Sequence, residues 1–276
     1  MKTLASMFKK ATVSFHSNAA SRHRGLVAVA LLSTCGWLQA APLPTLKVAA
    51  DPSFLPFAFM DQKSQQMQGF DMDLMRALGP IAGYEVQVLP LDFAGIIPAL
   101  QSGNVEASAS SITITDARKK VIDFSMPYYD SGLQILVKES GQGISNFEDL
   151  KGKTVAALTG STGYTFTQQT LGSDVKLVPY STYATAFLAL AAGSADAVVG
   201  DQPVIANYAA NAGKGKAKVV GPLYHGEQYG IAFTKGSKWL EPTNKALETV
   251  KANGTYATLY QKWFGTQPSK SADVTQ

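Results

Sequence analysis

From residue 46 onwards, two spacings of apolar residues alternate along the chain. Short runs in which apolar positions alternate or follow one another predict strands, and they lie at 46–50, 84–88, 105–110, 133–137, 154–158, 177–178, 195–200, 219–220 and 229–233. Runs with apolar residues three or four positions apart predict helices, at 69–78, 94–101, 146–150, 183–192, 240–253 and 256–263, with further helices starting after Thr115, at 164 and after 201. Strands that alternate with helices in this way predict an α/β fold in which mostly parallel sheets are flanked by helices.

One pattern occurs twice, at 99–107 and at 189–197. Each copy reads Ala-Leu, two residues, Gly, one residue, a small apolar residue, an acid and Ala. In each copy a predicted helix ends at the Gly and a strand follows, which indicates two similar α/β lobes. In this register the pair 110–111 corresponds to the pair 200–201, at the carboxyl ends of equivalent strands, where open parallel sheets bind ligands.

The stretch 110–125 contains the most concentrated candidate chemistry. Hydroxyl residues alternate with β-branched residues up to Ile114, Thr115 is a predicted helix N-cap, and Arg118 follows in the first turn. Such a corner suits a carboxylate, because free backbone N–H groups point at the anion and a guanidinium grips it with two bonds. The alternative is an ordinary strand-to-helix turn with a solvated arginine.

A zwitterionic ligand would pair this corner with an acid on the opposite lobe. Arg118 and the N–H groups near Thr113 would bind an α-carboxylate. Asp201, together with Ser110 and Ser111, would bind an α-ammonium. Deleting one member of a buried charge pair costs roughly 3–5 kcal/mol, so a ligand that supplies both missing charges would stabilise closed lobes. The alternative for Asp201 by itself is a helix N-cap before Gln-Pro.

Two further features complete the predicted cleft. Ser161 and Thr162 lie in a Gly-flanked turn at a helix start, which would offer more amide donors to the same carboxylate. A plain turn is the alternative, and a phosphate loop is disfavoured because no Gly-Lys-Ser/Thr follows. Phe54 and Phe93 could sandwich a short ligand side chain, although isolated Phe residues more often belong to the core.

The charge of the chain is concentrated at its start. Residues 1–40 contain five of the 24 Lys and Arg residues and no acid, which leaves 19 basic against 20 acidic residues in the remainder. A net charge near −1 disfavours binding to nucleic acid or to an acidic membrane surface.

Residues 1–40 are typical of a secretory signal peptide. A basic start is followed by the apolar run 26–38 and by small residues up to Ala40, after which we predict cleavage and a periplasmic location. The run is shorter than the ~20 residues that a spanning helix needs. A lipoprotein anchor at Cys35 is a lesser alternative, because Thr34 is atypical before the cysteine. Cys35 is the only cysteine, so the mature chain would contain no disulfide.

Six stretches together carry a family resemblance: 92–101 (DFAGIIPALQ), 112–120 (ITITDARKK), 122–125 (IDFS), 228–233 (QYGIAF), 253–256 (NGTY) and 262–266 (KWFGT). They resemble the polar amino-acid-binding proteins of ABC importers, solute-binding protein family 3, and most closely the glutamine-binding members. The resemblance covers residues 46–266 and implies the type II periplasmic-binding-protein fold, in which two segments cross between two lobes.

The resemblance also implies where the lobes begin and end. The crossing segments would lie at 128–132 and 225–229. Lobe 1 would be discontinuous, formed by 41–127 and 230–266. Lobe 2 would be 133–224, and a polar tail would follow at 267–276.

In the family, the residue that matches Arg118 holds the ligand carboxylate and the residue that matches Asp201 holds the ammonium. The other residues expected to line the ligand site are Asp51, Phe54, Phe93, Ser110, Ser111, Thr113, Leu158, Ser161 and Thr162. Leu158 stands where glutamine-binding members have a Lys, and Gly200 where they have a His. Leu158 and the pair 110–111 look more like the histidine- and lysine/arginine/ornithine-binding members, which also keep an acid that matches Asp51.

The implied function is the delivery of a polar L-amino acid to an inner-membrane ABC permease with its ATPase. Glutamine is favoured and a basic amino acid is the alternative. The protein would act as a monomer, without cofactor or metal, and not as an enzyme. A cyclohexadienyl-dehydratase-like enzyme on this fold would need a general acid in the cleft, for which the candidates are Asp51, His225 and Glu227. A chemoreceptor is an alternative partner.

Overall fold

The computed structural model describes residues 41–141 and 143–268. The predicted signal peptide, with its cleavage site after Ala40 and the alternative anchor at Cys35, lies outside the described residues, as does most of the predicted polar tail. In the described part of the chain, every helix is too short or too polar to cross a membrane.

The strands of the main sheet are hydrogen-bonded in the order β10-β9-β11-β8-β12-β6-β1-β5, and β7 pairs with β12. Their bounds are β1 Thr45–Ala50, β5 Glu85–Pro90, β6 Ala107–Thr113, β7 Asp123–Phe124, β8 Tyr129–Lys138, β9 Thr154–Leu158, β10 Lys176–Tyr180, β11 Ala197–Asp201 and β12 Ala217–Phe233. Strands β5, β1 and β6 are parallel to one another, and so are β10, β9 and β11. The two parallel groups confirm the predicted α/β lobes.

Strands β8 and β12 make the sheet mixed, because they run antiparallel to each other and to their neighbours β11 and β6. The predicted crossing segments lie opposite each other in these two strands, where Gly132 pairs with Gly226 and Tyr129 with Tyr229. Phe57 packs its ring 4.9 Å from that of Tyr129 and 5.5 Å from that of Tyr229. The aromatic core of the first lobe therefore anchors both crossing strands.

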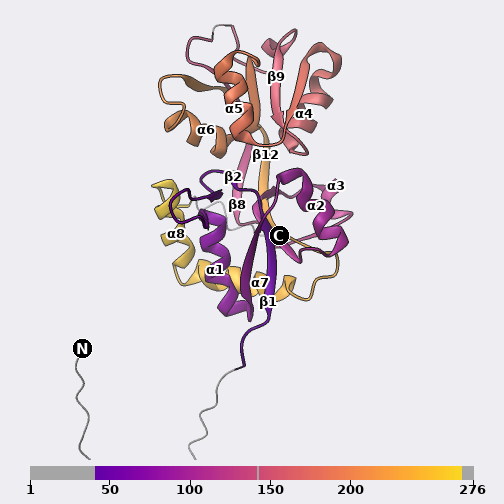
Figure 1. Ribbon diagram of the computed structural model, residues 1–276, viewed down its shortest axis with the longest axis vertical. Helices are drawn as coiled ribbons and strands as arrows, with labels where there is room; N and C mark the ends of the chain where they lie inside the picture. The colour runs from indigo at the N-terminus through magenta and orange to yellow at the C-terminus, as the bar shows by residue number, and fades with distance from the viewer. Residues whose placement is uncertain (1–40, 142, 269–276) are drawn as a thin grey trace, which may run out of the picture. The chain divides into compact units, whose positions relative to one another are not determined.

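Helices cover both groups of strands, as Figure 1 shows. Around β1, β5 and β6 lie α1 Phe70–Ala82, α2 Phe93–Ser102, α3 Asp116–Lys119, α7 Leu240–Ala252 and α8 Thr255–Phe264. Beside β9 and β11 lie α4 Thr162–Leu171, α5 Tyr183–Ala192 and α6 Gln202–Ala210. The short 3₁₀ turns are η1 Glu148–Leu150 and η2 Gly172–Asp174.

Besides shifts of strand ends and the unpredicted short elements β7 and η2, the structure differs from the predicted elements at four places. Helix α1 does not end at 78 but passes through Pro80, because Gly79 has no Cβ to clash with the proline ring. The predicted helix 146–150 is only the 3₁₀ turn η1. The predicted strands 219–220 and 229–233 are parts of the single strand β12. A small antiparallel sheet of β2 Ser53–Phe54, β3 Ala58–Met60 and β4 Met67–Gln68 was not predicted.

Candidate functional site

The predicted carboxylate corner forms where β6 ends and α3 begins. Thr115 caps α3 by accepting a hydrogen bond from the Arg118 N–H at 3.2 Å, which confirms the predicted N-cap. The Arg118 guanidinium is buried, with Nη1 donating to the Thr113 carbonyl at 2.8 Å and Nη2 to the Gly160 carbonyl at 3.0 Å. Burial lowers the pKa of Arg118, while the nearby negative charges of Asp201 and Glu227 oppose that shift. The alternative of a solvated arginine is therefore wrong.

The Gly160 carbonyl belongs to the second lobe, at the turn that precedes α4. Ser161 caps this helix, since its Oγ accepts a hydrogen bond from the Tyr164 N–H at 3.1 Å. Thr162 is the first residue of α4, so its N–H belongs to a helix N-terminus, where backbone donors favour an anion. Ser161, Thr162 and Arg118 line one groove of about 480 Å³.

Asp201 lies at the carboxyl end of β11 with its side chain buried. Its Oδ1 accepts a hydrogen bond from the Tyr183 hydroxyl at 2.8 Å and its Oδ2 accepts one from the Tyr229 hydroxyl at 2.6 Å. Asp201 occupies the N-cap position of α6, as the alternative predicted, but its side chain makes no capping hydrogen bond and is held by the two tyrosines instead. Burial raises the pKa of Asp201, and the two tyrosine bonds and Arg118 oppose this shift.

The side-chain end of the predicted cleft is formed by Asp51, Phe54 and Phe93. The two phenylalanine rings stack on each other with centroids 5.3 Å apart and planes at 21°. Asp51 is fully buried and links the segments that carry the two rings. It accepts hydrogen bonds from the Ser53 N–H and hydroxyl and from the Phe93 N–H. Burial raises the pKa of Asp51. Ser110 supports this loop by accepting a hydrogen bond from the Asp51 N–H at 2.9 Å.

Ser111 is held from within the first lobe. Its backbone lies in the left-handed region with φ of 51°. The Asp71 carboxylate accepts hydrogen bonds from the Ser111 N–H at 2.8 Å, the Ser111 hydroxyl at 3.3 Å and the Tyr128 hydroxyl at 2.8 Å. Burial raises the pKa of Asp71 to about 6, against the hydrogen bonds from these partners. No local sequence pattern links Asp71 to Ser111, because 40 residues separate them.

Glu227 is the carboxylate that the ligand-site prediction left out. It lies on β12 between the lobes, and its Oε2 accepts a hydrogen bond from the Thr113 hydroxyl at 3.1 Å. Its Oε1 is the buried side-chain atom among the described residues that has no hydrogen-bond partner, and it lies 3.6 Å from Nδ1 of the half-exposed His225. Burial, followed by the charge of Asp201, raises the pKa of Glu227 to about 7.

Leu158, the last residue of β9, is fully buried and belongs to the main apolar cluster. It therefore contributes an apolar side chain at a strand end where the glutamine-binding members have a charged one.

Comparison with known proteins places this arrangement in a family. The bacterial extracellular solute-binding proteins, family 3, match residues 46–266. The probable histidine-binding protein of Neisseria gonorrhoeae is 34% identical over 252 residues, covering 87% of this chain and 93% of that protein. The L-arginine-binding protein of Pseudomonas aeruginosa is 33% identical over 249 residues, covering 87% and 94%.

Solved structures agree in fold. An ancestral arginine-binding protein bound to arginine has a TM-score of 0.78 and 41% identity, covering 82% of this chain and all of that one. The same coverage and identity hold for an ancestral arginine-binding protein bound to glutamine, with a TM-score of 0.77. The chain belongs to family 3 of the bacterial extracellular solute-binding proteins.

Proposed function

We propose that this protein is the periplasmic binding component of an ABC importer, which holds one L-amino acid between its lobes and delivers it as a monomer to a membrane permease with its ATPase. The observation that carries the proposal is the pair of buried, oppositely charged side chains Arg118 and Asp201, which come from different lobes. An α-amino acid brings the matching carboxylate and ammonium on adjacent atoms.

Each charge of the ligand would face a side chain of opposite charge that hydrogen bonds already hold in place. Two bonds to carbonyls orient the Arg118 fork, and a guanidinium has five N–H donors, so donors remain for a carboxylate. The N-terminus of α4 adds backbone N–H groups. Two tyrosine hydroxyls fix the Asp201 carboxylate for an ammonium. Because the two partners lie on different lobes, a bound zwitterion stabilises the closed arrangement.

The charge balance of the cleft favours a cationic amino acid such as arginine or histidine. Asp51 and Asp201 are both buried there, against the single cation Arg118 among the described residues that line the cleft. A ligand with a positively charged side chain offsets more of this negative charge than a neutral one. The relatives named for histidine and arginine agree with this assignment.

Glutamine, which the sequence favoured over a basic amino acid, becomes the second candidate on this charge balance. Asp51 already accepts three hydrogen bonds from Ser53 and Phe93, so part of its capacity to meet a cation is used. An ancestral relative has been solved with arginine and with glutamine. The choice between the two ligand classes rests on the charge balance.

We regard the protein as a binder and not as an enzyme. Asp51 is engaged by its own loop, and His225 has a half-exposed side chain at the edge of the cleft. Glu227 has the raised pKa of a general acid. Its position on the crossing strand β12, where it accepts a hydrogen bond from Thr113 of β6, also suits a purely structural role. Release of product from prephenate or arogenate by the purified protein would contradict this assignment.

A thermal-shift screen of residues 41–276 against the amino acids tests the proposal. A ligand that binds only the native state at 100 times its Kd stabilises it by about 2.7 kcal/mol, so the cognate amino acid should raise the melting temperature by several degrees. Arginine and histidine are expected to lead the ranking, followed by glutamine. If no amino acid shifts the transition, the proposed function is wrong.

A further inference from the structure

Tyr183, the first residue of α5, is fully buried beside Asp201, the proposed partner of the ligand ammonium. Its hydroxyl donates to Asp201 Oδ1 at 2.8 Å and accepts from the Asp201 N–H at 3.0 Å. The same residue therefore binds both the side chain and the backbone of Asp201. The hydroxyl hydrogen is committed to this contact and is not available to a ligand.

Gly200, immediately before Asp201, makes room for that hydroxyl. A Cβ on Gly200 would lie 2.6 Å from the Tyr183 oxygen and 2.7 Å from its Cε1. A Cβ atom essentially never lies this close to another heavy atom, so a side chain at 200 and the tyrosine at 183 in its present position exclude each other. Tyr183 fills the volume into which a side chain at 200 would extend.

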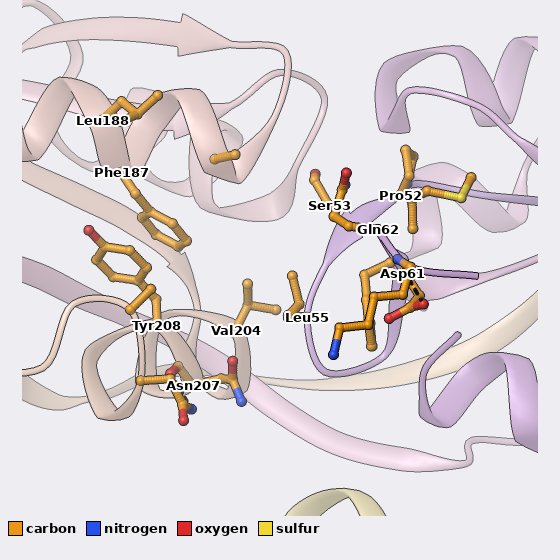
Figure 2. A pocket seen from close by; sticks show the side chains of 16 residues that line it. Pro52, Ser53, Leu55, Asp61, Gln62, Phe187, Leu188, Val204, Asn207 and Tyr208 are labelled. Carbon is orange, nitrogen blue, oxygen red and sulfur yellow. Dashed lines mark hydrogen bonds between the residues drawn. The ribbon is translucent and has the colours of Figure 1, made fainter. Parts of the chain in front are cut away.

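Neighbouring aromatic rings keep Tyr183 in this position. Its ring meets that of Phe54 at 5.1 Å and 71°, and stacks on Phe187 at 5.6 Å and 20°. Phe187 in turn stacks on Tyr208 at 4.0 Å. Figure 2 shows Phe187 and Tyr208 side by side at the wall of a pocket of about 700 Å³, with Ser53 and Leu55 across from them. Tyr183 is therefore packed between the ligand-site wall and this second pocket and cannot withdraw without disturbing both.

We propose that Tyr183 determines specificity in this site, by occupying the volume beside Gly200, so that no polar side chain at 200 reaches the ligand, and by holding Asp201 for the ligand ammonium. This inference rests on the proposed function and deepens it. Because the Tyr183 ring packs against that of Phe54, it also supports the wall of the ligand site.

A site lined by Phe54 and Phe93, with no polar side chain at position 200, selects by charge and shape. Planar cations such as guanidinium or imidazolium are attracted to the faces of aromatic rings. A neutral amide instead needs hydrogen-bond partners, and its affinity falls when they are absent. By excluding a polar side chain at position 200, Tyr183 therefore favours arginine or histidine over glutamine.

Titration calorimetry of arginine, histidine and glutamine with four variants tests the proposal. Tyr183→Phe removes a hydrogen bond to a charged group, so it should weaken all three ligands by roughly tenfold or more while leaving their ratios unchanged. Tyr84→Phe is the matched control, because Tyr84 is a buried tyrosine whose hydroxyl contacts Thr243 at 3.1 Å, outside the cleft; its affinities should equal those of the wild type.

The remaining two variants test the shared volume. Gly200→Gln alone should abolish binding by displacing Tyr183. Gly200→Gln combined with Tyr183→Ala places an amide side chain in the vacated volume, so it should restore binding and shift the arginine-to-glutamine affinity ratio at least tenfold toward glutamine.

The outcomes separate this inference from the proposed function. If the wild type binds none of the three amino acids, the proposed function itself fails. If it binds them but Tyr183→Phe leaves every affinity unchanged, or if the double variant keeps the wild-type ratio, the specificity role of Tyr183 is refuted while the binding function stands.

Discussion

Glu227 combines full burial of its carboxylate with an incomplete set of hydrogen bonds. The Thr113 hydroxyl donates to Oε2 and the Thr162 hydroxyl lies close by, while the nearest charged groups are Asp201 and Arg118, with His225 Nδ1 at 3.6 Å from Oε1. A buried charge without full hydrogen bonding is costly. The neutral carboxyl is therefore the favoured form in the folded protein, which is why its pKa rises to about 7.

This raised pKa gives stability a definite pH dependence. The folded state binds more protons than the unfolded state between the ordinary glutamate pKa of about 4.3 and the folded value. The stability contribution of Glu227 is thus complete below about pH 4.3 and lost as the pH rises through about 7. Glu227→Gln keeps the size and stays neutral, so it should stabilise the protein at pH 8 by on the order of 2–3 kcal/mol and have little effect at pH 4.5.

Urea unfolding of ligand-free protein at the two pH values measures this difference. Glu241→Gln is the control for charge removal, because Glu241 has an exposed side chain and pairs with Lys245 on α7. If Glu227→Gln raised the free energy of unfolding equally at pH 4.5 and pH 8, the raised pKa of Glu227 would not be the cause of the gain.

Helix α1 shows how two glycines at its ends meet different constraints. Gly69, before the helix, has φ of 126°, and a Cβ there would lie 2.0 Å from the Phe57 carbonyl oxygen. Gly83, after the helix, has φ of 83° with nothing within 4 Å of its Cβ position. Conformation alone requires glycine at 83, whereas conformation and close packing both require it at 69.

The two positions therefore predict unequal costs for the same change. Gly83→Ala should lower the free energy of unfolding by about 1–2 kcal/mol, the cost of left-handed backbone for a residue with a Cβ. Gly69→Ala should cost more than ~3 kcal/mol or prevent folding, because strain and overlap add. Denaturant titration of the two variants measures this difference. Equal losses in the free energy of unfolding would show that the overlap with the Phe57 carbonyl is relieved without cost.

The elements show which features a sequence can predict. The helix that follows Thr115 and the strand ends at 110–113 and 200–201 were predicted, because caps and periodicity are local signals. The continuity of β12 could not be predicted, since its middle, residues 221–228, alternates poorly and is held by pairing with β8. The contact of Arg118 with Gly160 and that of Tyr183 with Asp201 join residues 42 and 18 positions apart, and no local pattern encodes them.

Across the whole molecule, the two lobes share a sheet. Strands β8 and β12 pair with each other and also with β11 of one lobe and β6 of the other. Strands β9, β10 and β11 lie in the chain between β8 and β12, so neither parallel group can lose its strands without disturbing these two. The sequence predicted this division and both crossing segments through the family resemblance, while the ligand class depends on how the buried charges are arranged in space.

A shared sheet predicts cooperative unfolding. Scanning calorimetry of residues 41–276 should give one transition whose calorimetric and van't Hoff enthalpies agree, with and without the cognate amino acid. Two resolved transitions, of which only one responds to ligand, would show that the lobes are energetically independent.

The central claim is that Arg118 and Asp201, buried charges from separate lobes, together bind one amino acid. Titration calorimetry of L-arginine into the wild type, Arg118→Ala and Arg76→Ala tests it most directly. Arg76 has a half-exposed side chain and pairs with Asp73 on α1, so its variant controls for loss of an arginine. The account predicts wild-type affinity for Arg76→Ala and at least a hundredfold loss for Arg118→Ala, with a folded protein by circular dichroism, since a lost buried charge pair costs roughly 3–5 kcal/mol. Near-normal arginine affinity in Arg118→Ala would contradict it.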